Sequence, residues 1–68
     1  MISDDSELEA TQQRIQQFER QVAQIRRTES NPENYRLSAG GFLAEIDRMN
    51  LEIREYLWSL PEQSASAV

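Results

Sequence analysis

The chain has 68 residues with no cysteine and no histidine, which excludes disulfides, thiolate or imidazole metal ligands and the usual general base near neutral pH. Twelve acidic residues against seven arginines give a net charge of −5, which argues against binding nucleic acid by its phosphates and is compatible with a basic protein partner. No apolar run approaches the ~20 residues of a membrane span, and the N-terminus lacks the parts of a secretory signal, so we expect a cytoplasmic domain without membrane contact.

The first predicted helix covers about residues 4–28. A capping box of Ser6 with Glu9 would start it, and no glycine or proline interrupts it. Apolar residues, joined by Thr11, recur in it at alternating steps of three and four: Leu8, Ile15, Phe18, Val22 and Ile25. A stripe this narrow is typical of a helix that packs lengthwise on another helix.

A turn is predicted at about residues 29–31, followed by a second helix at about residues 32–59. Asn31 or Ser30 can cap this helix, while Pro32 takes its first position. Gly40 and Gly41 could break the helix, since each glycine costs about 1 kcal/mol in a helix interior. We expect the helix to continue, because the step of four and three keeps its phase across both glycines. The second stripe is Tyr35, Ala39, Phe42, Ile46, Met49, Ile53, Tyr56 and Leu60.

Together the two stripes, which we call the seam, predict an all-α fold: an antiparallel, coiled-coil-like two-helix hairpin over residues 1–60, with a disordered tail at 61–68. Folding at the turn pairs residues whose numbers sum to about sixty, for example Phe18 with Phe42. Phe18 would then fill the space that Gly40 and Gly41 leave, and a hinge at these glycines is the alternative. The predicted hairpin core is Leu8, Ile15, Phe18, Val22, Ile25, Tyr35, Ala39, Phe42, Ile46, Met49, Ile53 and Tyr56.

The second helix carries more large apolar residues than the seam needs. The alternatives are a wider contact between the two helices and an interface, and we favour the interface because the first helix has no second stripe to cover them. A chain this small is poorly stable alone, so a homodimer is expected, and two hairpins would form a four-helix bundle. The predicted partner or dimer interface is Leu37, Leu43, Leu51, Leu57 and Trp58.

Nothing in the pattern indicates catalysis. Glu45, Glu52 and Glu55 stand at helical spacings that a metal could gather, but di-metal bundles also use histidine. We instead predict solvated ion pairs of Glu45 with Arg48 and of Glu33 with Arg36. The protein is therefore predicted to be non-enzymatic, with no catalytic, cofactor-binding or metal-binding residue.

Residues 11–22, TQQRIQQFERQV, and residues 44–56, AEIDRMNLEIREY, resemble the helical segment that precedes the helix-turn-helix domain in some antitoxins of bacterial toxin–antitoxin operons of the host-inhibition-of-growth type. In that segment a Thr, a Phe-Glu and a later Leu or Val mark the first helix, and a Glu-Ile-x-Glu-Tyr-like run ends the second. The resemblance implies an acidic hairpin that dimerises or binds a basic toxin. The chain stops where the DNA-binding domain would begin, so we expect no direct nucleic-acid binding.

The architecture is also similar to the small hairpins of secretion-needle subunits and their co-chaperones, which share two helices and a polar turn. This similarity implies the alternative function, a structural assembly subunit or small chaperone of a larger complex such as a secretion apparatus.

Overall fold

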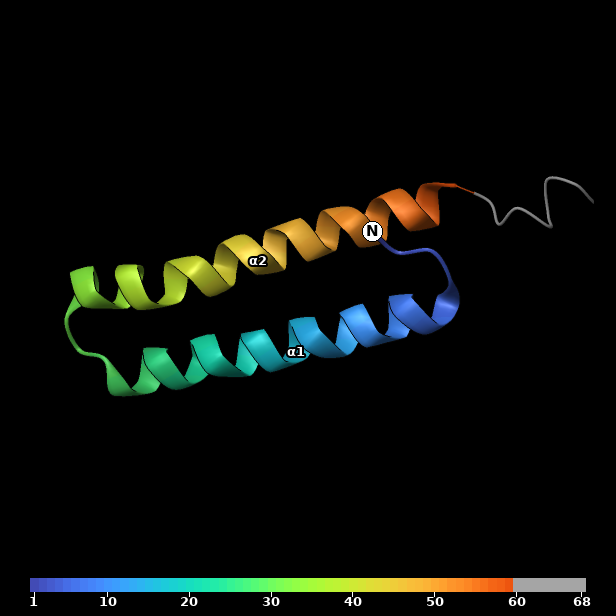
Figure 1. The fold of residues 1–68 in the computed structure, drawn as a ribbon. Helices are drawn as coiled ribbons and strands as arrows, with labels where there is room; N and C mark the ends of the chain where they lie inside the picture. The colour runs from blue at the N-terminus through green and yellow to red at the C-terminus, as the bar shows by residue number, and fades with distance from the viewer. Residues whose placement is uncertain (60–68) are drawn as a thin grey trace, which may run out of the picture.

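The computed structural model describes residues 1–59 and contains two helices, α1 (Asp5–Thr28) and α2 (Pro32–Trp58). They lie side by side in opposite directions and are joined by a short connection (Figure 1). The described residues contain no strand. The predicted all-α helical hairpin is confirmed, whereas Leu60 and the predicted tail at 61–68 lie outside the described residues.

The start of α1 differs from the prediction. Asp4 is the N-cap, and its side chain accepts a hydrogen bond from the backbone N–H of Glu7 at 2.8 Å. The Glu7 carboxylate in turn accepts hydrogen bonds from the backbone N–H of Ser3, at 2.8 Å, and from the Ser3 hydroxyl. The predicted capping box of Ser6 with Glu9 is therefore wrong, because Asp4 caps the helix two residues earlier and Glu7 accepts hydrogen bonds from Ser3, the residue before the N-cap.

The start of α2 confirms the prediction. The side chain of Asn31 accepts hydrogen bonds from the backbone N–H groups of Glu33 and Asn34, at 2.9 and 3.2 Å, and Pro32 takes the first helical position. The helix then continues through Gly40 and Gly41, neither of which has a positive φ. The two glycines therefore do not interrupt α2, as the unbroken seam predicted.

The predicted packing role of the two glycines is wrong. A Cβ atom built on Gly40 or Gly41 would meet no heavy atom within 4 Å, and both residues are exposed. Ala39, which is 0% exposed, is the small residue that α1 covers. Each helical residue is rotated by about 100° from the one before it, so the two glycines turn away from α1. Within the described residues, no contact requires a glycine at either position.

The hydrophobic core is one thin layer along the seam. Ile15, Ile46 and Met49 form its buried centre, with Phe18, Val22 and Ile53 packed around them. The rings of Phe18 and Phe42 meet edge to face, with centroids 5.4 Å apart, which confirms the pairing by sequence number. No large side chain among residues 1–59 is fully buried, because two helices alone cannot enclose one. All twelve predicted core residues are buried or half-buried.

Ile2 also belongs to the core, although it was not predicted there. The N-terminal residues turn back from the start of α1 toward α2 (Figure 1). Ile2 is only 8% exposed and lines the same cleft as Met49. The seam could not reveal this contact, because Ile2 precedes α1 and therefore has no place in a helical period.

Candidate protein-interaction surface

The exposed large apolar side chains of residues 1–59 lie, apart from Met1, on α2. Trp58 is 83% exposed and Leu37 is 77% exposed, so almost nothing in the hairpin covers them. The structure therefore places all five residues of the predicted interface at the surface: Leu37, Leu43, Leu51, Leu57 and Trp58.

Three of these residues belong to one stripe on the outer side of α2. Leu37, Ala44, Leu51 and Trp58 follow one another at steps of seven residues, which return to nearly the same side of a helix. Each of the four lies two residues after one seam residue and two residues before the next. Two residues correspond to a rotation of about 200° around the helix axis. These four residues, which we call the outer stripe, therefore face away from α1.

Leu43 and Leu57 lie elsewhere on α2. Each directly follows a seam residue, Phe42 or Tyr56, so both lie along one edge of the contact with α1. We call them the flanking leucines. The five apolar residues were predicted as one interface, and the helix geometry divides them between the outer stripe and this edge.

Two shallow grooves accompany the outer stripe. One, of about 470 Å³, lies between Leu51 and Trp58 and is also lined by Arg54 and Glu55. The other, of about 310 Å³, lies beside Leu37, and its lining includes the ring pair Phe18 and Phe42 together with Gly41. Because Gly41 has no side chain, this second groove stays open toward solvent.

Charged residues border the outer stripe on both sides. Asp47 and Arg48 follow Ala44 by three and four residues, and Arg54 and Glu55 follow Leu51 in the same way. All four are exposed. Helix geometry places Asp47 and Arg54 along one border, and Arg48 and Glu55 along the other. Among these four residues, each border therefore carries one charge of each sign.

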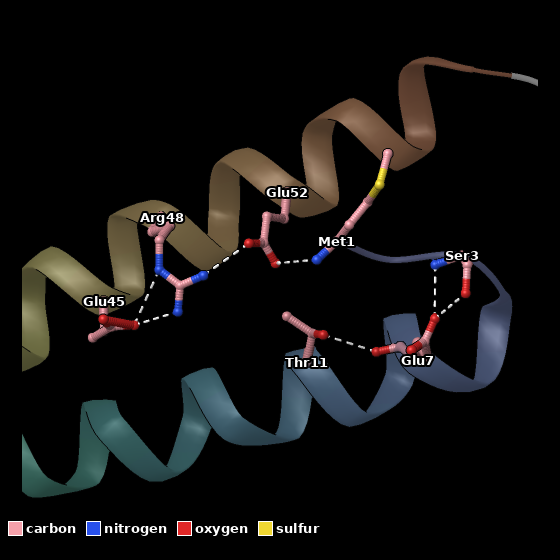
Figure 2. Close-up of polar contacts among 7 residues, drawn as sticks. All are labelled: Met1, Ser3, Glu7, Thr11, Glu45, Arg48 and Glu52. Atoms are coloured by element: carbon pink, nitrogen blue, oxygen red, sulfur yellow. Dashed lines mark hydrogen bonds and ion pairs between the residues drawn. The ribbon is translucent and has the colours of Figure 1, made fainter.

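Arg48 also organises a polar network on α2, shown in Figure 2. Its guanidinium donates to Glu45 through Nε at 3.2 Å and Nη2 at 2.5 Å, and to Glu52 through Nη1 at 2.8 Å. The hydrogen bonds to Glu45 raise the pKa of Arg48 above its ordinary value. Glu52 also lies 3.8 Å from the amino group of Met1. The predicted pair of Glu45 with Arg48 is thus confirmed.

The predicted pair of Glu33 with Arg36 has a different outcome from that of Glu45 with Arg48. Among the ion pairs of residues 1–59, Glu33 with Arg36 does not occur, so that predicted pair is wrong. A first-turn Glu33 is already near the positive end of the α2 dipole, which leaves little to gain from a solvated pair. No three acidic residues in the described part of the chain lie close enough together to hold a metal ion.

Tyr56 joins the free ends of the two helices. Its hydroxyl donates to the Asp5 carboxylate at 2.5 Å. This hydrogen bond, with partial desolvation and the nearby charges of Asp5 and Asp4, raises the pKa of Tyr56 to about 12. Tyr56 is therefore a structural contact of the hairpin, whereas the neighbouring Trp58 remains free on the outer stripe.

Neither α1 nor α2 combines the length and hydropathy that a helix needs to cross a membrane. Comparison of the chain with protein-family models, with curated proteins and with solved structures found no match.

Proposed function

We propose that the hairpin is a non-enzymatic protein–protein interaction module that dimerises through the exposed apolar residues of α2. The observation that carries this proposal is the exposure of Leu37, Leu51 and Trp58 on one side of a single helix. Large apolar side chains that stay exposed on one side of a helix are typical of interfaces, and tryptophan is a frequent centre of binding energy.

The thin core supports the same proposal. The hairpin buries few large side chains, and a domain of this size gains little stability from its own core. A second copy that covered the outer stripe would bury further apolar area, at about 25 cal/mol for each Å² removed from water. Dimerisation would therefore stabilise the fold as well as hide the stripe.

The substitution Leu51→Glu tests this proposal. Leu51 is 53% exposed in the single hairpin, so a glutamate there should leave helicity intact while placing two charges in the dimer interface. Analytical ultracentrifugation should find a dimer for the unmodified chain and a monomer for the variant, with similar circular dichroism. Asn50→Glu, at the adjacent exposed position outside the stripe, is the matched control and should remain dimeric.

We further propose that the dimer binds a basic protein, as the antitoxin resemblance implies. Negative charge gathers toward the open end of the hairpin: residues 1–16 and 46–59 hold seven carboxylates and three arginines, whereas residues 17–45 hold four of each. An arginine-rich peptide should therefore bind more weakly to Glu9→Gln than to the control Glu19→Gln, and binding should weaken as salt is added. Equal binding to both variants would contradict this part of the proposal.

A structural assembly subunit is the second candidate, favoured by the separation of the flanking leucines from the outer stripe. A molecule with two different apolar contact sites can add copies at both, and such contacts grow into open assemblies when they do not close. Sedimentation over a wide concentration range separates the candidates. A mass that stops at the dimer supports the interaction module, and a mass that keeps rising supports the assembly subunit.

A further inference from the structure

We propose that the outer stripe binds the same stripe of a second copy with the two α2 helices parallel, so that four helices form a flat layer with the α2 pair in the middle. This inference rests on the proposed dimer and specifies its geometry. It replaces the four-helix bundle expected from the sequence with a different arrangement of the same four helices.

The position of the stripe favours a layer over a bundle. In a four-helix bundle each helix contacts two neighbours, so both helices of each hairpin would need exposed apolar residues toward the second copy. Apart from Met1, the exposed large apolar residues of the described chain lie on α2. Because the outer stripe faces directly away from α1, a second copy seated on it extends the layer instead of closing a bundle.

The charges that border the stripe select the parallel orientation. When two identical helices pack in parallel, the left border of one meets the right border of the other at the same height. Asp47 of one copy then lies near Arg48 of the second, and Arg54 lies near Glu55, with each pairing made twice by symmetry. Charge complementarity of this kind fixes orientation and register at interfaces.

The antiparallel orientation brings like charges together. In this orientation each border of the stripe meets the same border of the second copy. The stripe runs from Leu37 to Trp58, so its centre lies between residues 47 and 48. Asp47 would therefore lie beside Asp47 of the second copy, and Arg48 beside Arg48 of the second copy. Juxtaposed like charges are unfavourable, so two of the four residues that stabilise the parallel pair, Asp47 and Arg48, oppose the antiparallel one.

Parallel packing also accounts for the two glycines. Gly40 and Gly41 follow Leu37 by the same three and four residues that separate the charged pairs from Ala44 and Leu51. They therefore border the stripe, and a Cβ atom added to either glycine would meet no heavy atom of this hairpin within 4 Å. The distance between packed helices depends on the side chains at the contact, so Gly40, Gly41 and Ala44 let the two α2 backbones approach closely.

The overall negative charge does not prevent this dimer. Asp4, Asp5, Glu7 and Glu9 begin α1, and α1 is the outermost helix of the layer. With neighbouring helices about 8–10 Å apart, the two α1 helices are separated by roughly 24–30 Å. That separation exceeds the Debye length of about 8 Å at physiological ionic strength, so their repulsion is largely screened.

Cysteine cross-linking tests the orientation, and the chain offers a clean background because it has no cysteine. In the parallel dimer, Ala44→Cys places two thiols opposite each other, and mild oxidation should convert most of the variant into a covalent dimer. Gln17→Cys, on the exposed side of α1, should remain largely uncrosslinked. If Ala44→Cys forms a disulfide no faster than this control, or links only to Leu51→Cys in a mixture, the parallel arrangement is overturned.

A charge exchange provides a second test that does not depend on oxidation. Arg54→Glu places like charges together in the parallel dimer and should weaken dimerisation by about 3- to 10-fold. The double variant Arg54→Glu with Glu55→Arg restores opposite charges and should recover most of the loss. A double variant that dimerises no better than Arg54→Glu contradicts the geometry, whereas an unmodified chain that remains monomeric contradicts the proposed function itself.

Discussion

Hydrogen bonds between single residues at the open end of the hairpin connect the two helices to each other and the N-terminal residues to α1. Tyr56 donates a hydrogen bond to Asp5 across the end, and Glu7 accepts hydrogen bonds from Ser3 at the start of α1. These contacts involve titratable groups, so each makes stability depend on pH over a different range. Seam periodicity did not identify either contact, because it reports which residues face the other helix and not which polar atoms meet.

The pair of Tyr56 with Asp5 should make the hairpin less stable in strong alkali. The pKa of Tyr56 rises from 10.0 to about 12 in the folded chain, chiefly through its hydrogen bond to Asp5. A raised folded-state pKa means that the stabilisation is complete below about pH 10 and is lost as the pH rises toward 12. Thermal unfolding followed by circular dichroism between pH 9 and 12 should show this loss in the unmodified chain and a smaller loss in Tyr56→Phe. An equal loss in both chains would contradict the assignment, because Tyr56→Phe has no hydroxyl group to ionise at this position.

The hydrogen bonds of Glu7 should make the stability of the hairpin depend on pH in the acidic range. The hydrogen bonds from the side chain and then the backbone of Ser3 lower the pKa of Glu7 below its ordinary value of 4.5. A lowered folded-state pKa gives stabilisation that is present above that value and lost as the pH falls through the folded-state pKa. In the variant Ser3→Ala, the melting temperature should therefore decrease less as the pH is lowered below 5. Ser6→Ala, which removes the hydroxyl of the incorrectly predicted cap, should leave the decrease unchanged.

At the scale of the helices, much of the fold could be predicted because one physical pattern governs it. The steps of three and four fixed which side of each helix is buried, and Asn31 with Pro32 fixed where α2 begins. The start of α1 was misplaced because several residues before it can cap a helix, and the sequence does not show which one the chain geometry favours. The role of Gly40 and Gly41 was misassigned because heptad phase does not show what lies beside a residue outside the seam.

The seam should carry most of the stability of a single hairpin. Ile46 is 8% exposed and lies in the buried centre of the core, so Ile46→Ala should destabilise the hairpin by about 2–5 kcal/mol and leave it largely unfolded. Leu37→Ala removes a similar volume from a side chain that is 77% exposed and should preserve the helical circular dichroism of the hairpin. Comparable loss of helicity in both variants would mean that the core has been located incorrectly.

Substitution of a glycine in α2 should have opposite effects on the stability of the helix and on dimerisation. An added methyl group on Gly40 meets no atom of the hairpin within 4 Å, so Gly40→Ala should stabilise the helix by about 0.5–1 kcal/mol. If a second α2 approaches there, the same methyl group should weaken dimerisation. Chemical denaturation at concentrations below the dimer dissociation constant, combined with sedimentation at higher concentrations, measures both effects. A variant that is more stable and dimerises at least as well would show that the glycines do not lie at the interface.

For the whole molecule, the sequence predicted where apolar residues would be exposed but not how they are arranged. All five residues of the candidate interface are at the surface, yet they divide into the outer stripe and the flanking leucines because Leu43 and Leu57 lie beside seam residues. The contribution of Ile2 to the core could not be predicted, since it depends on how the N-terminal residues fold back toward α2. The periodicity of the sequence therefore predicts the contact between the two helices, and the outer stripe is exposed in the described part of the chain.

We propose that this hairpin is one half of a dimer, and the mass of the purified chain in solution tests this proposal most directly. Sedimentation equilibrium at micromolar to millimolar concentration should give a mass that rises to twice 7.9 kDa and then stays constant. A folded, helical chain whose mass remains at 7.9 kDa across that range would contradict the account.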